Sequence, residues 1–71
     1  VNAIAPGYMR TPLNEGFLAD PERAREWTSG VPLGRIGEPR DLGGAVVYLA
    51  SEASAYVTGH TLVIDGGFTL W

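Results

Sequence analysis

The sequence predicts an α/β fold in which two short parallel strands flank a group of helices. Two apolar runs, at residues 1–4 and 61–64, have the length and the lack of polar alternation that are typical of buried strands. Helix-start signals follow the first run, and the last predicted helix leads directly to the second run. A helix that returns the chain to a neighbouring strand is half of a crossover connection, so we expect the two runs to pair in parallel.

A proline-glycine break ends the first run, and the residues after it form a candidate ligand loop. Pro6 and Gly7 stop the strand, and Thr11 with Pro12 is typical of a helix start, with the threonine as N-cap. The loop lies at the carboxyl end of a strand, where open α/β sheets bind their ligands. On pattern alone, Pro6 and Gly7 are also an ordinary strand terminator, and Thr11 is also an ordinary helix cap.

Two short helices are predicted between Thr11 and Ser29, inserted between the sheet elements. Asp20 followed by Pro21 repeats the pattern of an acceptor cap and a first-turn proline, so the second helix begins there. The first helix has Leu13, Phe17 and Leu18 on one face and the second has Ala24 and Trp27; Phe17, Leu18 and Trp27 either pack within the pair or contact a ligand.

A third helix is predicted from Pro39 to about Ser51, with apolar residues at helical spacing. Two consecutive glycines, Gly43 and Gly44, lie inside it at a cost of about 1 kcal/mol each relative to alanine. We infer that another backbone approaches the helix there and offsets this cost. The predicted apolar stripe comprises Leu42, Val46, Leu49 and Ala50.

The composition limits the classes of site and of partner. The chain contains no Cys and one His, which excludes a disulfide and argues against a metal site. The net charge is −3 and the five basic residues, all Arg, are scattered, so no nucleic acid is expected as a partner. No apolar run approaches the roughly 18 residues of a membrane span, and the first residues lack the pattern of a signal peptide, so we expect a cytoplasmic location without membrane contact.

The size of the chain indicates that its stability depends on a partner, on self-association or on the rest of a longer chain. A core built from 71 residues without a disulfide is marginal on its own. The sequence also begins with Val1 inside an apolar run, so we expect it to be a piece of a longer chain. The apolar end, residues 68–71, is expected to dock on another surface.

Three stretches occur in an order and spacing shared with one protein family. The first is Asn-Ala-Ile-Ala-Pro-Gly at residues 2–7, followed by Thr11. The second is Pro-Leu-Gly-Arg-Ile-Gly-Glu-Pro-Arg-Asp-Leu at residues 32–42, and the third runs from Leu-Ala-Ser at 49–51 through Thr-Gly at 58–59 to Asp-Gly-Gly at 65–67. The chain closely resembles, over essentially all of its length, the carboxyl-terminal portion of the classical short-chain dehydrogenase/reductase family. Around Tyr8 and Leu13 it most resembles gluconate and 2-deoxygluconate dehydrogenases, and next the ketoacyl reductases.

This resemblance implies a fold and a cofactor. The chain is expected to be the carboxyl-terminal third of a Rossmann-type, doubly wound parallel sheet, with residues 1–71 as one partial domain and residues 12–30 as a substrate lid. The implied cofactor is NAD or NADP, with its nicotinamide end against the proline-glycine loop. The residues implied to bind it are Pro6, Gly7, Tyr8, Met9 and Thr11, with backbone contact from Met9 and a hydroxyl from Thr11.

The resemblance also implies an oxidoreductase that interconverts an alcohol and a ketone, with a sugar acid or polyol as substrate. The family's catalytic Ser and Tyr-x-x-x-Lys pair are missing, because the chain has no Lys and its Tyr48 and Tyr56 precede Glu52 and His60 at that spacing. No catalytic residue and no metal ligand is therefore assigned, and the chain alone should be inactive. The implied partner is the missing amino-terminal portion or a second copy, bound from Pro39 to Ala50 and from Thr61 to Asp65.

An alternative function is a non-catalytic, self-associating module that binds no cofactor. The polar residues of the chain also have structural interpretations. We expect His60 to be structural or solvated rather than a base, and Asp65 to cap the strand exit or pair across a subunit contact rather than bind a metal. Arg35 is expected to bridge to Glu38 or Asp41, with a phosphate contact as the alternative.

Overall fold

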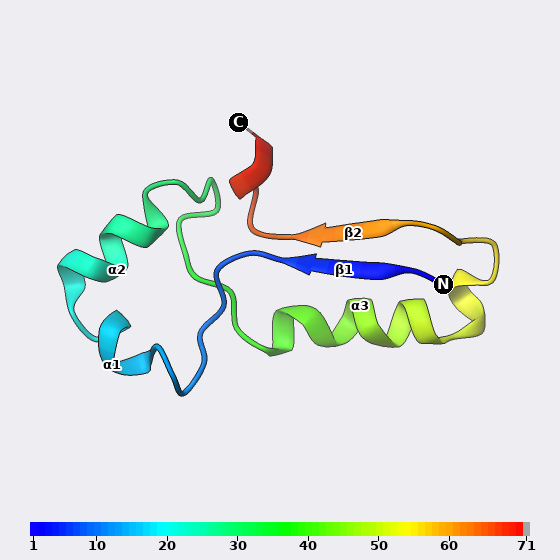
Figure 1. Ribbon diagram of the computed structural model, residues 1–71, viewed down its shortest axis with the longest axis horizontal. Coiled ribbons are helices and arrows are strands. Elements are labelled where there is room, and N and C mark those ends of the chain that lie inside the picture. The colour runs from blue at the N-terminus through cyan, green and yellow to red at the C-terminus, as the bar shows by residue number, and fades with distance from the viewer. Residues whose placement is uncertain (71) are drawn as a thin grey trace.

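Two strands pair in parallel and form the sheet of the computed structural model, which describes residues 1–70 (Figure 1). Strand β1 is Ala3–Pro6 and strand β2 is Thr61–Ile64, in a register that pairs Ala3 with Thr61 and Pro6 with Ile64. The parallel pairing and the bounds of β2 confirm the prediction. The expected first strand at residues 1–4 is shifted by two residues, because the ladder continues until the Gly7 N–H donates to Ile64 O at 3.0 Å.

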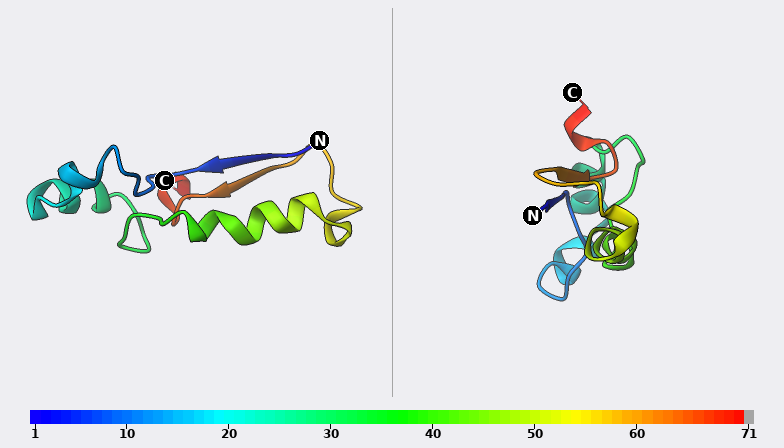
Figure 2. Two further views of the ribbon diagram at one scale, coloured as in Figure 1. Left: turned by 90° about the horizontal axis from the view of Figure 1, so that it is seen from below. Right: turned by 90° about the vertical axis from the view of Figure 1, so that its right-hand side faces the viewer.

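Helix α3, Arg40–Ala50, runs along one face of the two strands (Figure 2). Its bounds agree with the predicted helix, but its covered stripe is rotated. Leu42, Ala45 and Leu49 are half-buried, whereas Val46 and Ala50, expected on the same stripe, are exposed.

The two glycines inside α3 have no close neighbour. A Cβ placed on Gly43 or Gly44 would have no atom of residues 1–70 within 4 Å apart from the adjoining backbone of α3 itself. The backbone approach inferred from these glycines is therefore not made within the described part of the chain. Exposed apolar side chains, Val47 and Tyr48 among them, also lie on this helix.

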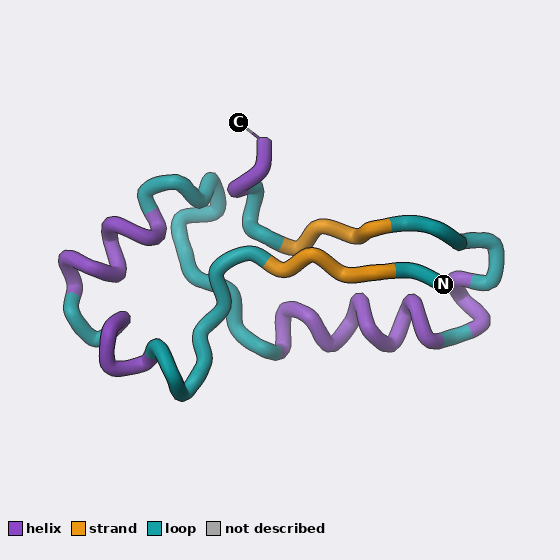
Figure 3. Tube along the Cα trace, in the orientation of Figure 1, coloured by secondary structure: helices purple, strands orange, loops and turns teal. Residues whose placement is uncertain are grey.

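Helices α1, Glu15–Leu18, and α2, Pro21–Thr28, form a pair beyond the carboxyl ends of the strands (Figure 3). The start of α2 is as predicted, because the Asp20 side chain accepts a hydrogen bond from the Glu22 N–H at 3.0 Å. The prediction of Thr11 as the N-cap of the first helix is wrong. Residues 12–14 form a turn, and α1 begins only at Glu15.

The turn before α1 also changes which apolar residues are covered. Leu13 is 98% exposed, so it does not belong to the apolar face predicted for the first helix, whereas Leu18 is buried. The cause is local, since the Thr11 N–H donates to Asn14 Oδ1 at 2.8 Å and the chain turns before it becomes helical.

Two short 3₁₀ helices complete the chain: η1, Glu52–Ser54, after α3, and η2, Phe68–Leu70, after β2. The tight turn between β2 and η2 needs glycine, because Gly66 and Gly67 have φ angles of 63° and 97°. Trp71, which belongs to the apolar end of the sequence, lies outside the described residues.

The described residues close only a small apolar core. Their buried apolar side chains are Leu18, Val31 and Ile36, with 5%, 6% and 6% exposed, and all three lie outside the strands and α3. The radius of gyration is 14.1 Å, whereas a closed domain of this length has a value of about 11 Å. The sheet and α3 are therefore left with apolar faces that other surfaces can cover. None of the helices in residues 1–70 is long and apolar enough to cross a bilayer.

Gly7→Ala is expected to destabilise the fold, because Gly7 lies against the backbone at the end of β2. A Cβ there would lie 2.6 Å from Asp65 Cβ and 2.8 Å from Asp65 Cα, so the strand ends would have to separate. Overpacking of this kind lowers the free energy of unfolding by about 1–3 kcal/mol, which urea titration measures.

Gly16→Ala is the matched control for this substitution. Gly16 lies in α1, and a Cβ there would have no atom of residues 1–70 within 4 Å apart from the adjoining backbone of α1 itself. This change should be neutral or stabilising, because alanine favours a helix. Equal losses at the two positions would contradict the close packing of Gly7 on Asp65.

Candidate functional site

The loop that follows β1 lies at the carboxyl ends of both strands. Pro6 ends β1, and Gly7 packs against Asp65, which directly follows β2. Tyr8, Met9 and Thr11 continue from there towards α1. The residues singled out from the sequence therefore form one continuous loop at the edge where parallel sheets bind ligands.

The backbone of Gly37 holds one side of this loop. Gly37 N–H donates to Tyr8 O at 2.9 Å, and Arg10 N–H donates to Gly37 O at 2.8 Å, which makes an isolated parallel bridge between Met9 and Gly37. A Cβ on Gly37 would collide with the Met9 sulfur and lie 3.4 Å from Tyr8 O. Gly37, interpreted from the sequence only as part of a connector, thus holds the loop through its backbone and lies close to the Met9 side chain.

This bridge determines where the backbone groups of Met9 point. In a parallel bridge the neighbours of the central residue take the hydrogen bonds, so the N–H and C=O of Met9 face away from Gly37. Met9 O accepts a hydrogen bond from Asn14 Nδ2 at 2.8 Å. No hydrogen bond among residues 1–70 uses the Met9 N–H or Thr11 Oγ1. The loop therefore presents one backbone donor and one hydroxyl.

Aromatic side chains join this loop to the helical pair and to the end of the chain. The Tyr8 ring stacks on Trp27 of α2 with a centroid distance of 4.7 Å, and it meets Phe68 of η2 edge-on at 5.4 Å. Phe17 of α1 lies 5.0 Å from Trp27, and the guanidinium of Arg23 lies over the Phe17 ring. The predicted packing of Phe17 and Trp27 within the helical pair is confirmed, and Tyr8 extends it to the loop.

Two hollows flank the Tyr8 ring at the strand ends. One, with a volume of about 220 Å³, is lined by Met9, Val31 and Ile64 among others. The other, of about 400 Å³, is lined by residues that include Pro6 and Phe68. Tyr8 and Asp65 line both hollows, so both lie against the ends of β1 and β2. Among residues 1–70, no three His, Cys, Asp or Glu side chains gather closely enough to hold a metal ion.

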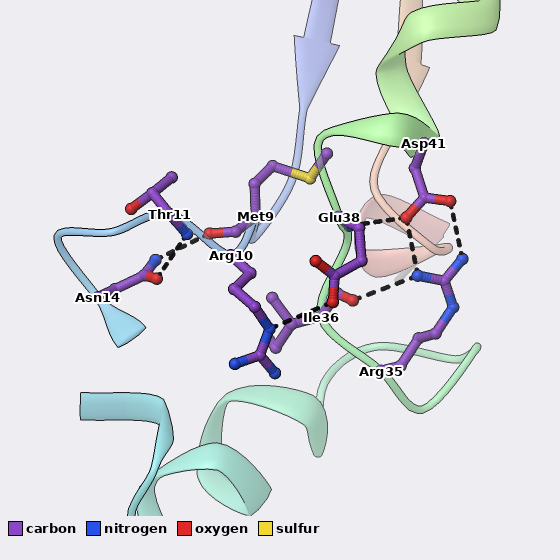
Figure 4. Close-up of polar contacts among 8 residues, drawn as sticks. All are labelled: Met9, Arg10, Thr11, Asn14, Arg35, Ile36, Glu38 and Asp41. Carbon is purple, nitrogen blue, oxygen red and sulfur yellow. Dashed lines mark hydrogen bonds and ion pairs between the residues drawn. The ribbon is translucent and has the colours of Figure 1, made fainter. Parts of the chain in front are cut away.

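Two ion pairs secure the connector that carries Gly37 (Figure 4). Arg10 Nε donates to Glu38 Oε1 at 3.2 Å, which ties the loop to the connector. Arg35 makes two hydrogen bonds to the Asp41 carboxylate, at 2.8 and 3.1 Å. The expected bridge from Arg35 to the start of α3 is therefore confirmed for Asp41, whereas Glu38 pairs with Arg10. Exposed pairs contribute about 0.2–1 kcal/mol each, so they orient the connector more than they stabilise it.

The carboxylate of Asp41 serves the connector as an acceptor. The pKa of Asp41 lies well below its usual range. The largest cause is hydrogen bonding from the Arg35 guanidinium, and the second is a hydrogen bond from the backbone N–H of Glu38 at 2.7 Å. Asp65 plays a similar part after β2, because a hydrogen bond from the Thr69 hydroxyl lowers its pKa and its other oxygen accepts from Gly67 N–H at 2.9 Å. The predicted strand-exit cap at Asp65 is confirmed.

His60 lies at the opposite end of the strands from the loop. The backbone N–H of His60 donates to Asn2 Oδ1 at 3.0 Å, and the residue is exposed. This agrees with the expected structural or solvated role. The residues that sequence analysis did not single out for the site are Asn14 and Gly37, since a lone Asn and a connector Gly carry no signal of a long-range contact.

Comparison with known proteins identifies the family. A family model described as "Enoyl-(Acyl carrier protein) reductase" matches residues 1–69. Glucose 1-dehydrogenase of Gluconobacter oxydans is 46% identical over 71 residues, which cover 100% of this chain and 27% of that protein. The chain belongs to the short-chain dehydrogenase/reductase family.

Other members of this family show the same relationship. D-arabinitol 2-dehydrogenase of Candida albicans is 47% identical over 73 residues, which cover 100% of this chain and 26% of that protein. The structure of a gluconate 5-dehydrogenase from Burkholderia cenocepacia, in complex with NADP and tartrate, matches with a TM-score of 0.86 and 41% identity, covering 100% of this chain and 28% of that one. The chain spans about a quarter of the length of the curated relatives that it matches.

The family assignment fits the observed architecture. The solved relatives are Rossmann-type enzymes, and the two parallel strands with α3 form an α/β fragment of that fold. The resemblance to gluconate and 2-deoxygluconate dehydrogenases is confirmed, and NAD or NADP is the cofactor of the family.

The loop offers the chemistry that the nicotinamide carboxamide needs. A carboxamide has both an acceptor oxygen and donor hydrogens. The Met9 N–H and the Thr11 hydroxyl are unused among residues 1–70, and Met9 O has a second lone pair beside the one that Asn14 takes. The residues present therefore fit this end of NAD(P).

Replacing Asp41 by Asn is expected to make the free energy of unfolding depend less on pH in the acidic range. Because the pKa of Asp41 is lower in the folded state than in the unfolded state, its contribution is full above the unfolded pKa of about 4 and falls as the pH drops below that value. Asp41→Asn should thus lower the urea midpoint at neutral pH, and the gap to the wild type should narrow towards about pH 2.

Glu52→Gln is the control for loss of a carboxylate, since Glu52 makes no ion pair among residues 1–70. This variant should follow the wild-type pH profile. A gap between the wild type and Asp41→Asn that stays constant from neutral to acidic pH would contradict the assigned role of Asp41.

Proposed function

We propose that this chain supplies part of the nicotinamide pocket of an NAD(P)-dependent dehydrogenase that interconverts an alcohol and a ketone. The observation that carries the proposal is the loop from Pro6 to Thr11 at the carboxyl ends of two parallel strands, with the Met9 N–H and the Thr11 hydroxyl unused. When bound, NAD(P) supplies the nicotinamide ring that accepts or donates the hydride. The chain's own residues bind and orient that end of the cofactor.

The geometry of the loop supports a separate role for each of its residues. Met9, bridged to Gly37, directs its N–H and C=O away from Gly37, so both groups are available to a carboxamide. Thr11, two residues further along the loop, offers a hydroxyl. Gly7 allows close approach of the two strand ends, since any side chain there would meet Asp65. Pro6 and Tyr8 both line the hollow of about 400 Å³ at the strand ends.

A sugar acid or a polyol is the proposed substrate class. The relatives whose names describe a gluconate, a glucose and an arabinitol dehydrogenase support this choice. We propose that α1 and α2 form the lid over the substrate. The stack of Tyr8 on Trp27 supports this role, because it connects the helical pair directly to the loop that is proposed to hold the nicotinamide.

The proposal extends to the surfaces on which the segment assembles. Val46, Val47 and Tyr48 of α3 and Val63 of β2 leave 49%, 68%, 43% and 49% of their area exposed. Exposed apolar residues grouped in this way mark protein–protein contacts. We propose that the remaining part of the enzyme, or a second copy, covers the surfaces from Pro39 to Ala50 and from Thr61 to Asp65.

Cofactor titration and an activity assay test the function. The full-length protein should bind NADH or NADPH, seen as a change in nicotinamide fluorescence, and should reduce NAD(P) with polyols or aldonic acids. If it binds neither nucleotide and light scattering shows self-association, the alternative of a non-catalytic assembly module replaces the proposal.

Thr11→Val is expected to weaken cofactor binding because it removes the hydroxyl but keeps the shape of the side chain. Loss of one hydrogen bond of about 0.5–1.5 kcal/mol corresponds to a rise of roughly 2- to 12-fold in the Kd for NAD(P)H. Thr58→Val is the matched control, since Thr58 is exposed and lies beside Val1 at the amino ends of the strands, away from the loop. Equal Kd values for the wild type and Thr11→Val would contradict the role of Thr11.

A further inference from the structure

The side-chain amide of Asn14 bonds to the backbone of the loop at two points. Its Nδ2 donates to Met9 O at 2.8 Å, and its Oδ1 accepts from Thr11 N–H at 2.8 Å (Figure 4). Asn14 lies just before α1 but makes no capping hydrogen bond to that helix. Both of its hydrogen-bonding ends are therefore committed to the loop.

Asn14 and Gly37 hold the loop from opposite sides. Gly37 bonds to the residues on either side of Met9, so it leaves the edge that carries the Met9 N–H open. Asn14 reaches that open edge and bonds to Met9 O, and at the same time it restrains Thr11. The two groups proposed to meet the carboxamide, Met9 N–H and Thr11 Oγ1, are thus restrained by one side chain.

We infer that Asn14 is a positioning residue for cofactor binding, which holds the loop in its binding conformation before the nucleotide arrives. The inference rests on the proposed function of the loop. Restraining a loop in its bound conformation raises affinity, because less conformational entropy is lost on binding. The role needs a neutral amide, which offers both a donor and an acceptor, whereas the ionised carboxylate of an Asp of the same length offers only acceptors.

The chain contains a matched control in Asn2. Its Nδ2 donates to Val57 O at 3.1 Å and its Oδ1 accepts from His60 N–H at 3.0 Å, so it also joins two backbone groups with one amide. Asn2 lies at the amino ends of the strands, away from the loop. Loss of its amide should affect stability but not the cofactor.

Three variants of the full-length protein test the inference: Asn14→Ala, Asn14→Asp and Asn2→Ala. Asn14→Ala should raise the Kd for NADH or NADPH about tenfold, as expected for two lost hydrogen bonds of about 0.7 kcal/mol each. Asn14→Asp keeps the acceptor for Thr11 N–H but loses the donor and places a carboxylate against Met9 O, so it should bind no better than Asn14→Ala. Asn2→Ala should lower Tm with a Kd within about twofold of the wild type.

Measurements beyond affinity separate positioning from general stability. Without nucleotide, amide hydrogen exchange of Met9 and Thr11 should accelerate in both Asn14 variants and stay unchanged in Asn2→Ala. The KM for the cofactor should rise more than the KM for the alcohol. If Asn14→Ala does not fold, Asn14→Asp, which keeps one of the two bonds, decides the question by the same readouts.

The outcomes distinguish this inference from the function on which it rests. A wild-type protein that binds neither nucleotide overturns the proposed function, and the inference with it. A wild-type protein that binds, together with Asn14 variants whose Kd stays within about twofold of it, overturns the role of Asn14 alone. Equal Kd changes in Asn14→Ala and Asn2→Ala would show a general loss of stability and would also overturn it.

Discussion

The parallel pairing of β1 with β2 is the constraint on which the other features of this chain depend. It joins the two ends of the sequence and sets the carboxyl ends of both strands side by side. The loop after β1 and the turn after β2 must then share a small space, which is possible because Gly7 brings no side chain against Asp65. The candidate site is therefore a consequence of strand register and of one missing Cβ.

Restraint of the loop comes from short hydrogen bonds more than from charge. Gly37 contributes two backbone bonds and Asn14 two side-chain bonds to residues 8–11, all between 2.8 and 2.9 Å. The Arg10–Glu38 pair is longer and about one third exposed, so it adds little free energy. Tyr8, stacked on Trp27, links this restrained loop to the helical pair. The helical pair and the loop are thus in direct physical contact.

Elements with strong local signals were predictable from the sequence, and long-range contacts were not. Strand β2 and the start of α2 at Asp20-Pro21 are determined by residues that are adjacent in the sequence, and both predictions agree with the structure. The predicted N-cap at Thr11 is wrong because the Thr11 N–H bonds to the Asn14 side chain, and the chain turns before the helix begins. The covered apolar stripe of α3 is rotated from the predicted one, because helical spacing alone does not determine which side of a helix faces the sheet. The loop position was predictable, whereas its restraint by Asn14 and Gly37 depends on the tertiary fold.

A crystal structure of the full-length protein with bound NADH or NADPH would show where the nicotinamide lies relative to the loop after β1. We expect its carboxamide within hydrogen-bond distance of the Met9 N–H, with Asn14 still bonded to Met9 O and Thr11 N–H. A nicotinamide bound elsewhere, with the Met9 N–H facing water or another protein segment, would contradict it.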